Sequence, residues 1–350
     1  MATLIQDYDY HLPPELVAQN PLAPRNASRL LVLRRDTGEL QHARFRDLPG
    51  WLAPGDALVV NDTRVFPARL RGVKPTGGRV ELLLQFLPEP EGNGAVPQSA
   101  RARANYRGRL RAGQTLQFGP ALAAEVLSLP QPGTAEVRLW SSRGEVLAAV
   151  QEAGEVPLPP YIRRLAAPQD RESYQTVFAA RSGAVACPTA GLHFTGPVLA
   201  ALARQNIDVI PITLHVGPGT FMPVRAQDYT RHLLLPEYFE LSPESAARLN
   251  AARDRGQRLV AVGTTSVRVL EFCATPAGFA PQKGWCDLFI YPGYRFKAVD
   301  RLITNFHLPK STLLLLVSAF AGRELVMRAY EEAVKEKYRF YSYGDCMLIL

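Results

Sequence analysis

The feature that most constrains the fold of this chain is a change of pattern near residues 70 and 150. Between these points, short runs of alternating apolar and polar residues are separated by segments rich in turn residues, and the clearest runs are 79–86, 114–118 and 135–140. Alternation with a period of two indicates β-strands, and no stretch before Gly144 has the pattern of a long helix. Residues 71–150 are therefore predicted to form an inserted small β-rich domain, a barrel or a sandwich.

The flanking residues, 1–70 and 151–350, have the pattern of a large mixed α/β (α+β) domain. Candidate strands lie at 29–34, 56–60, 207–216 and 259–262, and candidate helices at 197–205, 243–256, 313–321 and 324–337. Thr195, Ser242 and Ser311 stand where helix N-caps are expected. We predict a discontinuous catalytic domain with a mixed sheet, interrupted by the insert.

Charge and cysteine content narrow the functional class. The chain has 40 Lys and Arg against 32 Asp and Glu, a formal net charge of +8, which favours polyanionic partners without specifying one. Its four cysteines lie far apart, so we expect reduced thiols and no metal site. The first residues do not resemble a signal peptide, and the apolar stretch 313–321 is too short to cross a bilayer. We expect a cytoplasmic, monomeric protein with no membrane contact.

Four segments share one design, in which an apolar strand runs into a loop rich in Gly, Thr, Ser, Asn or His. They are residues 185–194, 213–221, 262–268 and 304–309. Small residues let the backbone approach a ligand closely, and hydroxyl and amide groups supply hydrogen-bond donors. The segment Gly263–Ser266 joins a strand to a helix start, which favours an anionic group, although an ordinary N-cap has the same composition.

Three histidines, His193, His215 and His307, fall in these loops. Imidazole titrates near neutral pH, so each is a candidate general acid or base, and each is also compatible with a structural role. No two of them share a helix at the spacing of metal ligands. Near the C-terminus, residues 338–345 combine aromatic side chains with Asp345, a composition suited to a stacked base or a sulfonium cation and equally to core packing.

The insert carries a row of arginines of the same parity: Arg101, Arg103, Arg107, Arg109 and Arg111. On one extended strand they would point to the same side and could contact RNA phosphates. The same row is typical of a solvated edge strand, and the glycines at 108 and 113 argue against one continuous strand.

Taken together, six segments resemble the S-adenosylmethionine:tRNA ribosyltransferase-isomerase family of queuosine biosynthesis. They are NDTRV (61–65), PTAGLHF (188–194), TLHVGPGTF (213–221), VGTTSVR (262–268), TNFHLPKSTL (304–313) and YRFYSYGD (338–345). The resemblance implies a cosubstrate, S-adenosylmethionine, and a partner, tRNA carrying 7-aminomethyl-7-deazaguanine at the wobble position. It implies transfer of the ribosyl carbons to that base, giving epoxyqueuosine, with release of adenine and methionine. After His232 this chain has Leu234-Leu235-Pro236 where relatives continue with methionine, histidine and serine.

The matching loops supply the candidate site residues. The candidates for proton transfer are His193, His215, His307, Asp62 and Asp345. The candidates for binding the cosubstrate and the base are Asn61, Thr63, Arg64, Thr189, Ala190, Gly191, Phe194, Gly217, Gly219, Thr220, Thr264, Thr265, Ser266, Arg268, Asn305, Tyr341 and Tyr343. Arg64 and Arg268 are expected to hold a carboxylate or a phosphate.

Two other functions fit parts of the pattern. An S-adenosylmethionine-dependent RNA methyltransferase would use the same cosubstrate, but residues 217–219 lack the rest of the usual glycine-rich fingerprint. A non-catalytic RNA-binding protein would agree with the charge, but it leaves the polar loops after the strands unexplained.

Overall fold

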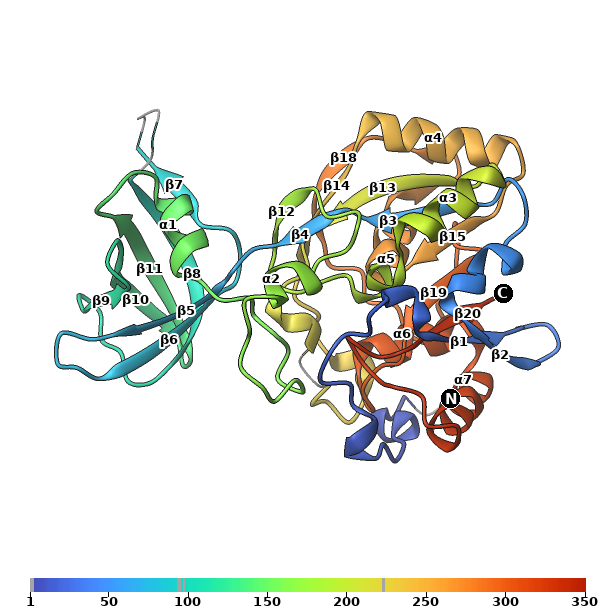
Figure 1. Ribbon diagram of the computed structural model, residues 1–350, viewed down its shortest axis with the longest axis horizontal. Coiled ribbons are helices and arrows are strands. Elements are labelled where there is room, and N and C mark those ends of the chain that lie inside the picture. Colours follow the sequence, from blue (N-terminus) through green and yellow to red (C-terminus); the bar gives the residue numbers. More distant parts are fainter. Residues whose placement is uncertain (1–2, 93–95, 97, 222–223) are drawn as a thin grey trace.

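The computed structural model describes residues 3–92, 96, 98–221 and 224–350, without the side chains of Thr220 and Phe221. Figure 1 shows two parts of unequal size, a small β-rich part and a larger α/β part. They are joined through β4 (Thr63–Val65), which pairs in parallel with β12 (Arg181–Ala184), and through the chain that returns after residue 153.

The large part is built on a nine-stranded mixed sheet formed by the described residues. In spatial order its strands are β18 (Gln282–Cys286), β14 (Glu237–Leu241), β13 (Asp208–Leu214), β3 (Ala57–Asn61), β15 (Leu259–Val262), β19 (Arg301–Asn305), β20 (Cys346–Ile349), β1 (Arg29–Leu33) and β2 (Leu40–Arg44). The central strands β13, β3, β15 and β19 are parallel, whereas β20 is antiparallel to β19. This is the mixed α/β class predicted from the sequence.

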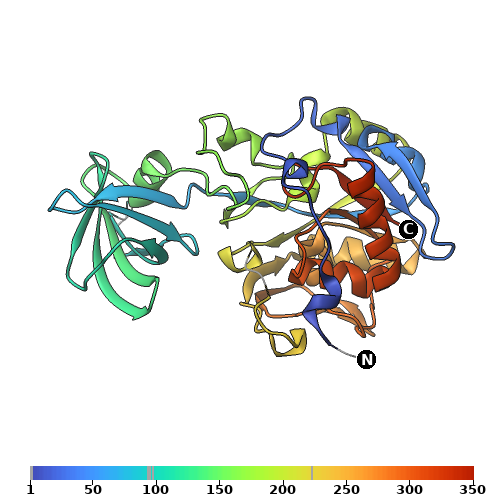
Figure 2. The same cartoon turned by 90° about the horizontal axis from the view of Figure 1, so that it is seen from below.

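Alternation of side chains along the strands gives the sheet two buried faces. In β3, Ala57 and Val59 belong to one apolar cluster, and Leu58 and Val60 belong to another. The first face is covered by the helices α4 (Pro243–Asp254), α5 (Thr264–Cys273), α6 (Thr312–Ala321) and α7 (Arg323–Lys335). The second is covered by α3 (Gly196–Arg204) and the 3-10 helices η4 (Phe45–Trp51) and η5 (Thr189–His193). Figure 2 shows the sheet between these layers.

The small part is a closed antiparallel barrel. Within the described residues, six strands pair in a ring: β5 (Arg69–Val73), β6 (Arg79–Leu84), β8 (Ser99–Arg107), β11 (Thr134–Ser141), β10 (Leu122–Gln131) and β9 (Thr115–Phe118). The short strand β7 (Glu89–Glu91) adds to β8, and α1 (Val146–Ala153) packs on the barrel core. The barrel has its own apolar core, to which Val185 of the large part contributes.

One detail differs from the sequence-based expectations, and a second agrees with the argument that the glycines interrupt the arginine row. Ser242 and Ser311 cap α4 and α6 as predicted, but the Thr195 side chain makes no capping bond to α3. Strand β8 ends at Arg107, so Arg109 and Arg111 do not lie on one strand with Arg101, because Gly108 turns the chain with a φ of 105°. In the described part of the chain no helix is long and apolar enough to span a membrane.

Candidate active site

The topology of the sheet brings the matching loops to one edge. Parallel strands present their carboxyl ends at the same edge, so the residues after β13, β3, β15 and β19 gather there. Antiparallel pairing of β20 with β19 places Cys346 opposite Asn305 and adds residues 338–345 to that edge. A pocket of about 660 Å³, including its open mouth, lies where these segments meet.

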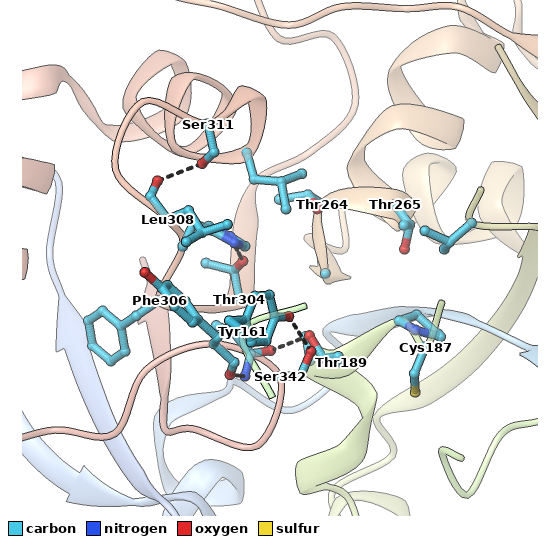
Figure 3. Close-up of a pocket in the computed structure, with 18 residues that line it drawn as sticks. Tyr161, Cys187, Thr189, Thr264, Thr265, Thr304, Phe306, Leu308, Ser311 and Ser342 are labelled. Atoms are coloured by element: carbon cyan, nitrogen blue, oxygen red, sulfur yellow. Dashed lines mark hydrogen bonds between the residues drawn. The ribbon is translucent and has the colours of Figure 1, made fainter. Parts of the chain in front are cut away.

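The pocket is lined mainly by hydroxyl, amide and aromatic groups (Figure 3). Seven of the predicted site residues line it: Thr189, Ala190, Thr264, Thr265, Asn305, His307 and Tyr341. It is also lined by Tyr161, Cys187, Pro188, Val216, Gly263, Thr304, Phe306, Leu308, Ser311, Leu313 and Ser342, which the sequence analysis did not single out as site residues.

The N-terminus of α5 opens into this pocket. Its N-cap residue, Gly263, has a φ of 86° and a ψ of 156°, and no side-chain capping bond to the helix is found among the described residues. Thr265, in the first turn, is 8% exposed, and its Oγ1 has no hydrogen-bond partner among the described residues. The positive end of the helix dipole and a free buried hydroxyl thus lie at one wall, an arrangement suited to an anionic group.

Asn305 is the central hydrogen-bonding residue of the opposite wall. Its Nδ2 lies 3.2 Å from His193 Nε2 and donates to the carbonyl oxygens of Tyr341 (3.2 Å) and Asp345 (3.4 Å). Its Oδ1 accepts from Thr189 Oγ1 at 3.1 Å. One amide therefore connects the end of β19 to η5 and to the C-terminal loop, and it fixes the shape of this wall.

His193 stands behind Asn305, outside the pocket. Its Nδ1 lies 2.8 Å from Ser28 Oγ, and its Nε2 accepts from Asn305, so the proton is on Nδ1. Burial, with the charges of Arg339 and Arg25, lowers the pKa of His193 to about 3. The imidazole is neutral at physiological pH, and in this geometry it positions Asn305.

Among the described residues, His307 is the one candidate histidine that lines the pocket. Its Nε2 lies 2.8 Å from Thr304 Oγ1, and its backbone N–H donates to the Tyr330 hydroxyl at 2.9 Å. Burial lowers the pKa of His307 to about 3, so the ring is neutral at pH 7 and its protonated form is disfavoured in this surrounding.

Two tyrosines form an aromatic wall. The rings of Tyr161 and Tyr341 lie 4.7 Å apart between centroids, and the Tyr161 hydroxyl lies 2.6 Å from Ser342 Oγ (Figure 3). Burial raises the pKa of both phenols, which therefore stay neutral. Sequence reasoning missed Tyr161 because it lies outside the six matching segments that supplied the candidate residues.

His215 and Asp62 lie to one side, near β12. His215 Nδ1 is 2.7 Å from Thr63 Oγ1, and its ring stacks on Tyr238. Burial and the charge of Arg181 lower the pKa of His215. Asp62 accepts from Thr213 Oγ1 at 2.6 Å and lies 3.7 Å from Arg181, and burial raises its pKa.

Arg268 already holds a carboxylate of the protein itself. Its guanidinium forms a buried ion pair with Glu237 and donates to the backbone oxygens of Leu288 and Cys286. Glu237 also accepts from the amide of Gly217 at 2.8 Å. This ion pair lies in a small cavity that shares Thr264 and Thr265 with the pocket.

Asp345 and Tyr343 also make internal contacts. The Asp345 carboxylate accepts from the backbone amides of Arg29 and Arg339, both at 2.8 Å, and burial raises its pKa. Tyr343 donates to Asp170 at 3.0 Å and faces the small cavity that His193 lines.

The remaining predicted residues do not line the pocket. Asn61 bonds the backbone of Leu214 and Thr63, Ser266 bonds Val262, Gly191 and Phe194 are buried, Arg64 is exposed, and Gly219 contacts Leu235. The side chain of Thr220 lies outside the described residues. Among the described residues, no group of three or more His, Cys, Asp or Glu side chains is placed to hold a metal ion.

Comparison with known proteins agrees with this geometry. The family model of the queuosine biosynthesis protein matches residues 5–349. The S-adenosylmethionine:tRNA ribosyltransferase-isomerase of Syntrophotalea carbinolica is 50% identical over 348 residues, which is 99% of each chain. That of an Anaeromyxobacter species is 52% identical over 346 residues, covering 99% of this chain and 98% of its own.

The chain belongs to the S-adenosylmethionine:tRNA ribosyltransferase-isomerase family. It is a ribosyltransferase-isomerase of queuosine biosynthesis, as the resemblance implied, and the methyltransferase and non-catalytic alternatives do not hold. The crystal structure of S-adenosylmethionine tRNA ribosyltransferase from Thermotoga maritima is 36% identical, with a TM-score of 0.56, over 98% of this chain and all of its own.

Proposed function

We propose that the pocket at the carboxyl edge of the sheet binds S-adenosylmethionine together with a 7-aminomethyl-7-deazaguanine base at the wobble position of tRNA. The ribosyl carbons pass to the aminomethyl group, epoxyqueuosine forms in the tRNA, and adenine and methionine leave. The observation that carries this proposal is the combination of an uncapped helix N-terminus and an aromatic pair in one pocket of a family member.

The first support is the match between the α5 N-terminus and the methionyl carboxylate. The free amides after Gly263 and the unpartnered Thr265 hydroxyl supply donors to an anion. No carboxylate is among the described residues that line the pocket, and Glu237 in the adjacent cavity is paired with Arg268. An amino-acid carboxylate is therefore the ligand group that this wall fits.

The second support is the aromatic pair. A sulfonium cation near the faces of Tyr161 and Tyr341 is attracted by the ring quadrupoles, and a purine stacks on the same faces. Because both phenols stay neutral, they add no charge that would compete with the sulfonium. The pair thus orients the reacting end of the cosubstrate while the methionyl end is held at α5.

We propose His307 as the residue that accepts the proton removed beside the sulfonium. It is the one candidate histidine that lines the pocket in the described structure, and its imidazole is neutral at pH 7, although burial makes it a weak base in the free protein. Departure of adenine, attack by the amine of the tRNA base and displacement of methionine by an alkoxide then follow from the reactivity of the cosubstrate itself. His193 and Asp345 act as positioning residues through Asn305 and the C-terminal loop.

We also propose that residues 71–150 form a separate domain within a catalytic domain of residues 1–70 and 151–350. The barrel core between Phe66 and Val150 supports this division. The protein is further proposed to act as a cytoplasmic monomer, without a metal.

The test is to incubate the protein with S-adenosylmethionine and tRNA carrying 7-aminomethyl-7-deazaguanine, and to identify the small-molecule products. We expect free adenine and methionine in equal amounts. Formation of S-adenosylhomocysteine, or no consumption of the cosubstrate, would overturn the proposal.

A further inference from the structure

A second, larger hollow lies between the barrel and the large part. It measures about 1550 Å³ including its open mouth. One wall is formed by residues 105–107 of β8 together with β5 and β6, and the other by residues 157–166. We call this hollow the interdomain groove.

The groove lies beside the active-site pocket. Three separate chain segments place neighbouring residues on the two sides, one in the pocket and one in the groove. These pairs are Tyr161 and Ile162, Cys187 and Val185, and Val216 and Pro218. A chain that lies in the groove would therefore pass close to the pocket.

The charge of the groove favours an anionic chain. Four arginines and one carboxylate line it: Arg69, Arg107, Arg163, Arg164 and Glu81. Arg164 is held by Asp170, but Arg163 is exposed, and no carboxylate of a described residue lies within 4.0 Å of it. The Arg107 side chain is 83% exposed, at the limit of contact with Glu81. These two guanidiniums are available to a ligand.

Arg69 adds a partly desolvated cation deeper in the groove. It donates to the carbonyl oxygen of Leu158 at 3.2 Å, while its buried Nε has no partner among the described residues. Burial lowers its pKa, and the negative charge of Glu81 offsets only part of that shift. A phosphate in the groove would further stabilise the charged guanidinium.

The groove also offers surfaces for unstacked bases. Tyr106 lines it beside Arg107, and Leu165 lines it with 68% of its surface exposed. Single-stranded RNA is held by such a combination of phosphate contacts from arginine and stacking on apolar or aromatic side chains.

We propose that the interdomain groove binds the sugar-phosphate backbone of the anticodon-loop nucleotides that flank the base in the pocket, through Arg69, Arg107 and Arg163. This inference rests on the proposed function. It differs from the arginine row seen in the sequence, with which it shares only Arg107. Arg101 of that row is already bound to Glu91.

The test compares the Kd of the modified tRNA for the wild type, for Arg107→Ala with Arg163→Ala, and for Arg204→Ala, over a series of salt concentrations. Arg204 is an exposed arginine of α3, so its removal deletes the same charge away from the groove. We expect the double variant to bind tRNA roughly tenfold or more weakly, with a salt slope smaller by about 1.4 for two lost phosphate contacts. The KM for S-adenosylmethionine should not change, and Arg204→Ala should bind as the wild type does.

Two results would overturn the inference. The first is a double variant that keeps the wild-type Kd and salt slope. The second is a loss of affinity in Arg103→Ala as large as in the double variant, since Arg103 lies on β8 but does not line the groove. If the wild type released no adenine, the proposed function would fail instead, so the two failures are distinct.

Discussion

At the scale of single residues, the pocket depends on polar atoms that the protein leaves for a ligand. Thr265 Oγ1 is buried without a partner, and such a group normally costs about 1–3 kcal/mol in a folded protein. A stable fold tolerates this cost where binding later satisfies the group. The unpaired hydroxyl thus lowers the stability of the ligand-free enzyme and favours binding of the cosubstrate.

The substitution Thr265→Val tests this reasoning. It removes the hydroxyl and keeps the shape, so we expect the KM for S-adenosylmethionine to rise by roughly tenfold. The free energy of unfolding without ligand should stay the same or increase. Decarboxylated S-adenosylmethionine serves as the control ligand, because its binding should be equal in both proteins. If Thr265→Val weakened the binding of both ligands equally, the carboxylate of S-adenosylmethionine would not lie at Thr265.

His193 gives a pH prediction. Its folded pKa, about 3, lies below the unfolded value of 6.5, so between these values only the unfolded state takes up the proton. Its contribution to stability is complete above pH 6.5 and is lost as the pH falls. At pH 5 the loss is about 2 kcal/mol. Urea unfolding at pH 7 and pH 5 should show a smaller pH effect for His193→Gln, and an unchanged effect would contradict the assigned burial.

The sequence predicted the kinds of site residues better than their positions. The motifs named His193, His215 and His307 alike, but side-chain direction at the end of a strand follows from tertiary packing. Only His307 of these lines the pocket in the described structure. Arg268, in α5, was expected to bind an external anion, but it pairs with Glu237 of β14, 31 residues earlier in the chain.

At the scale of elements, the ends of strands and helices were the most predictable features. Ser311 caps α6 and Ser242 caps α4, because local chemistry decides a helix start. The sheet order was not predictable, since the pairing of β20 with β19 and β1 depends on contacts across most of the chain. That pairing is what brings the C-terminal aromatic segment to the site.

Gly263 shapes the site at the scale of elements, because it joins β15 to α5. Its φ of 86° with a ψ of 156° belongs to a region used almost only by glycine. We expect Gly263→Ala to lower the free energy of unfolding by about 1–3 kcal/mol and to weaken S-adenosylmethionine binding by tilting α5. Gly196→Ala, where an added Cβ meets open space, is the matched control. If Gly263→Ala bound S-adenosylmethionine with the wild-type affinity, the α5 N-terminus would not be part of the cosubstrate site.

At the scale of the whole molecule, the sequence predicted an inserted β-rich part, but it did not predict that its strands close into a barrel. Alternation marks strands without specifying their partners, so a barrel and a sandwich remained equivalent. The barrel closes because β8 pairs with β11 as well as with β6. The interdomain groove follows from this arrangement.

Separate cores predict separate responses to mutation. Leu82 is fully buried in the barrel, so Leu82→Ala should destabilise it by about 2–5 kcal/mol. Hydrogen exchange should accelerate in β5, β6 and β8 but not in β3 or β15. Leu58→Ala, in β3, should give the reverse pattern. Equal acceleration in both parts would show that the molecule unfolds as one unit.

The central claim is that the ribosyl carbons of the cosubstrate move to the tRNA base in this pocket. It is tested most directly with S-adenosylmethionine labelled with carbon-13 in its ribosyl group, followed by mass spectrometry of the tRNA nucleosides. We predict that the modified nucleoside carries every labelled carbon and that the released adenine carries none. An unlabelled nucleoside, or label that leaves with the adenine, would contradict it.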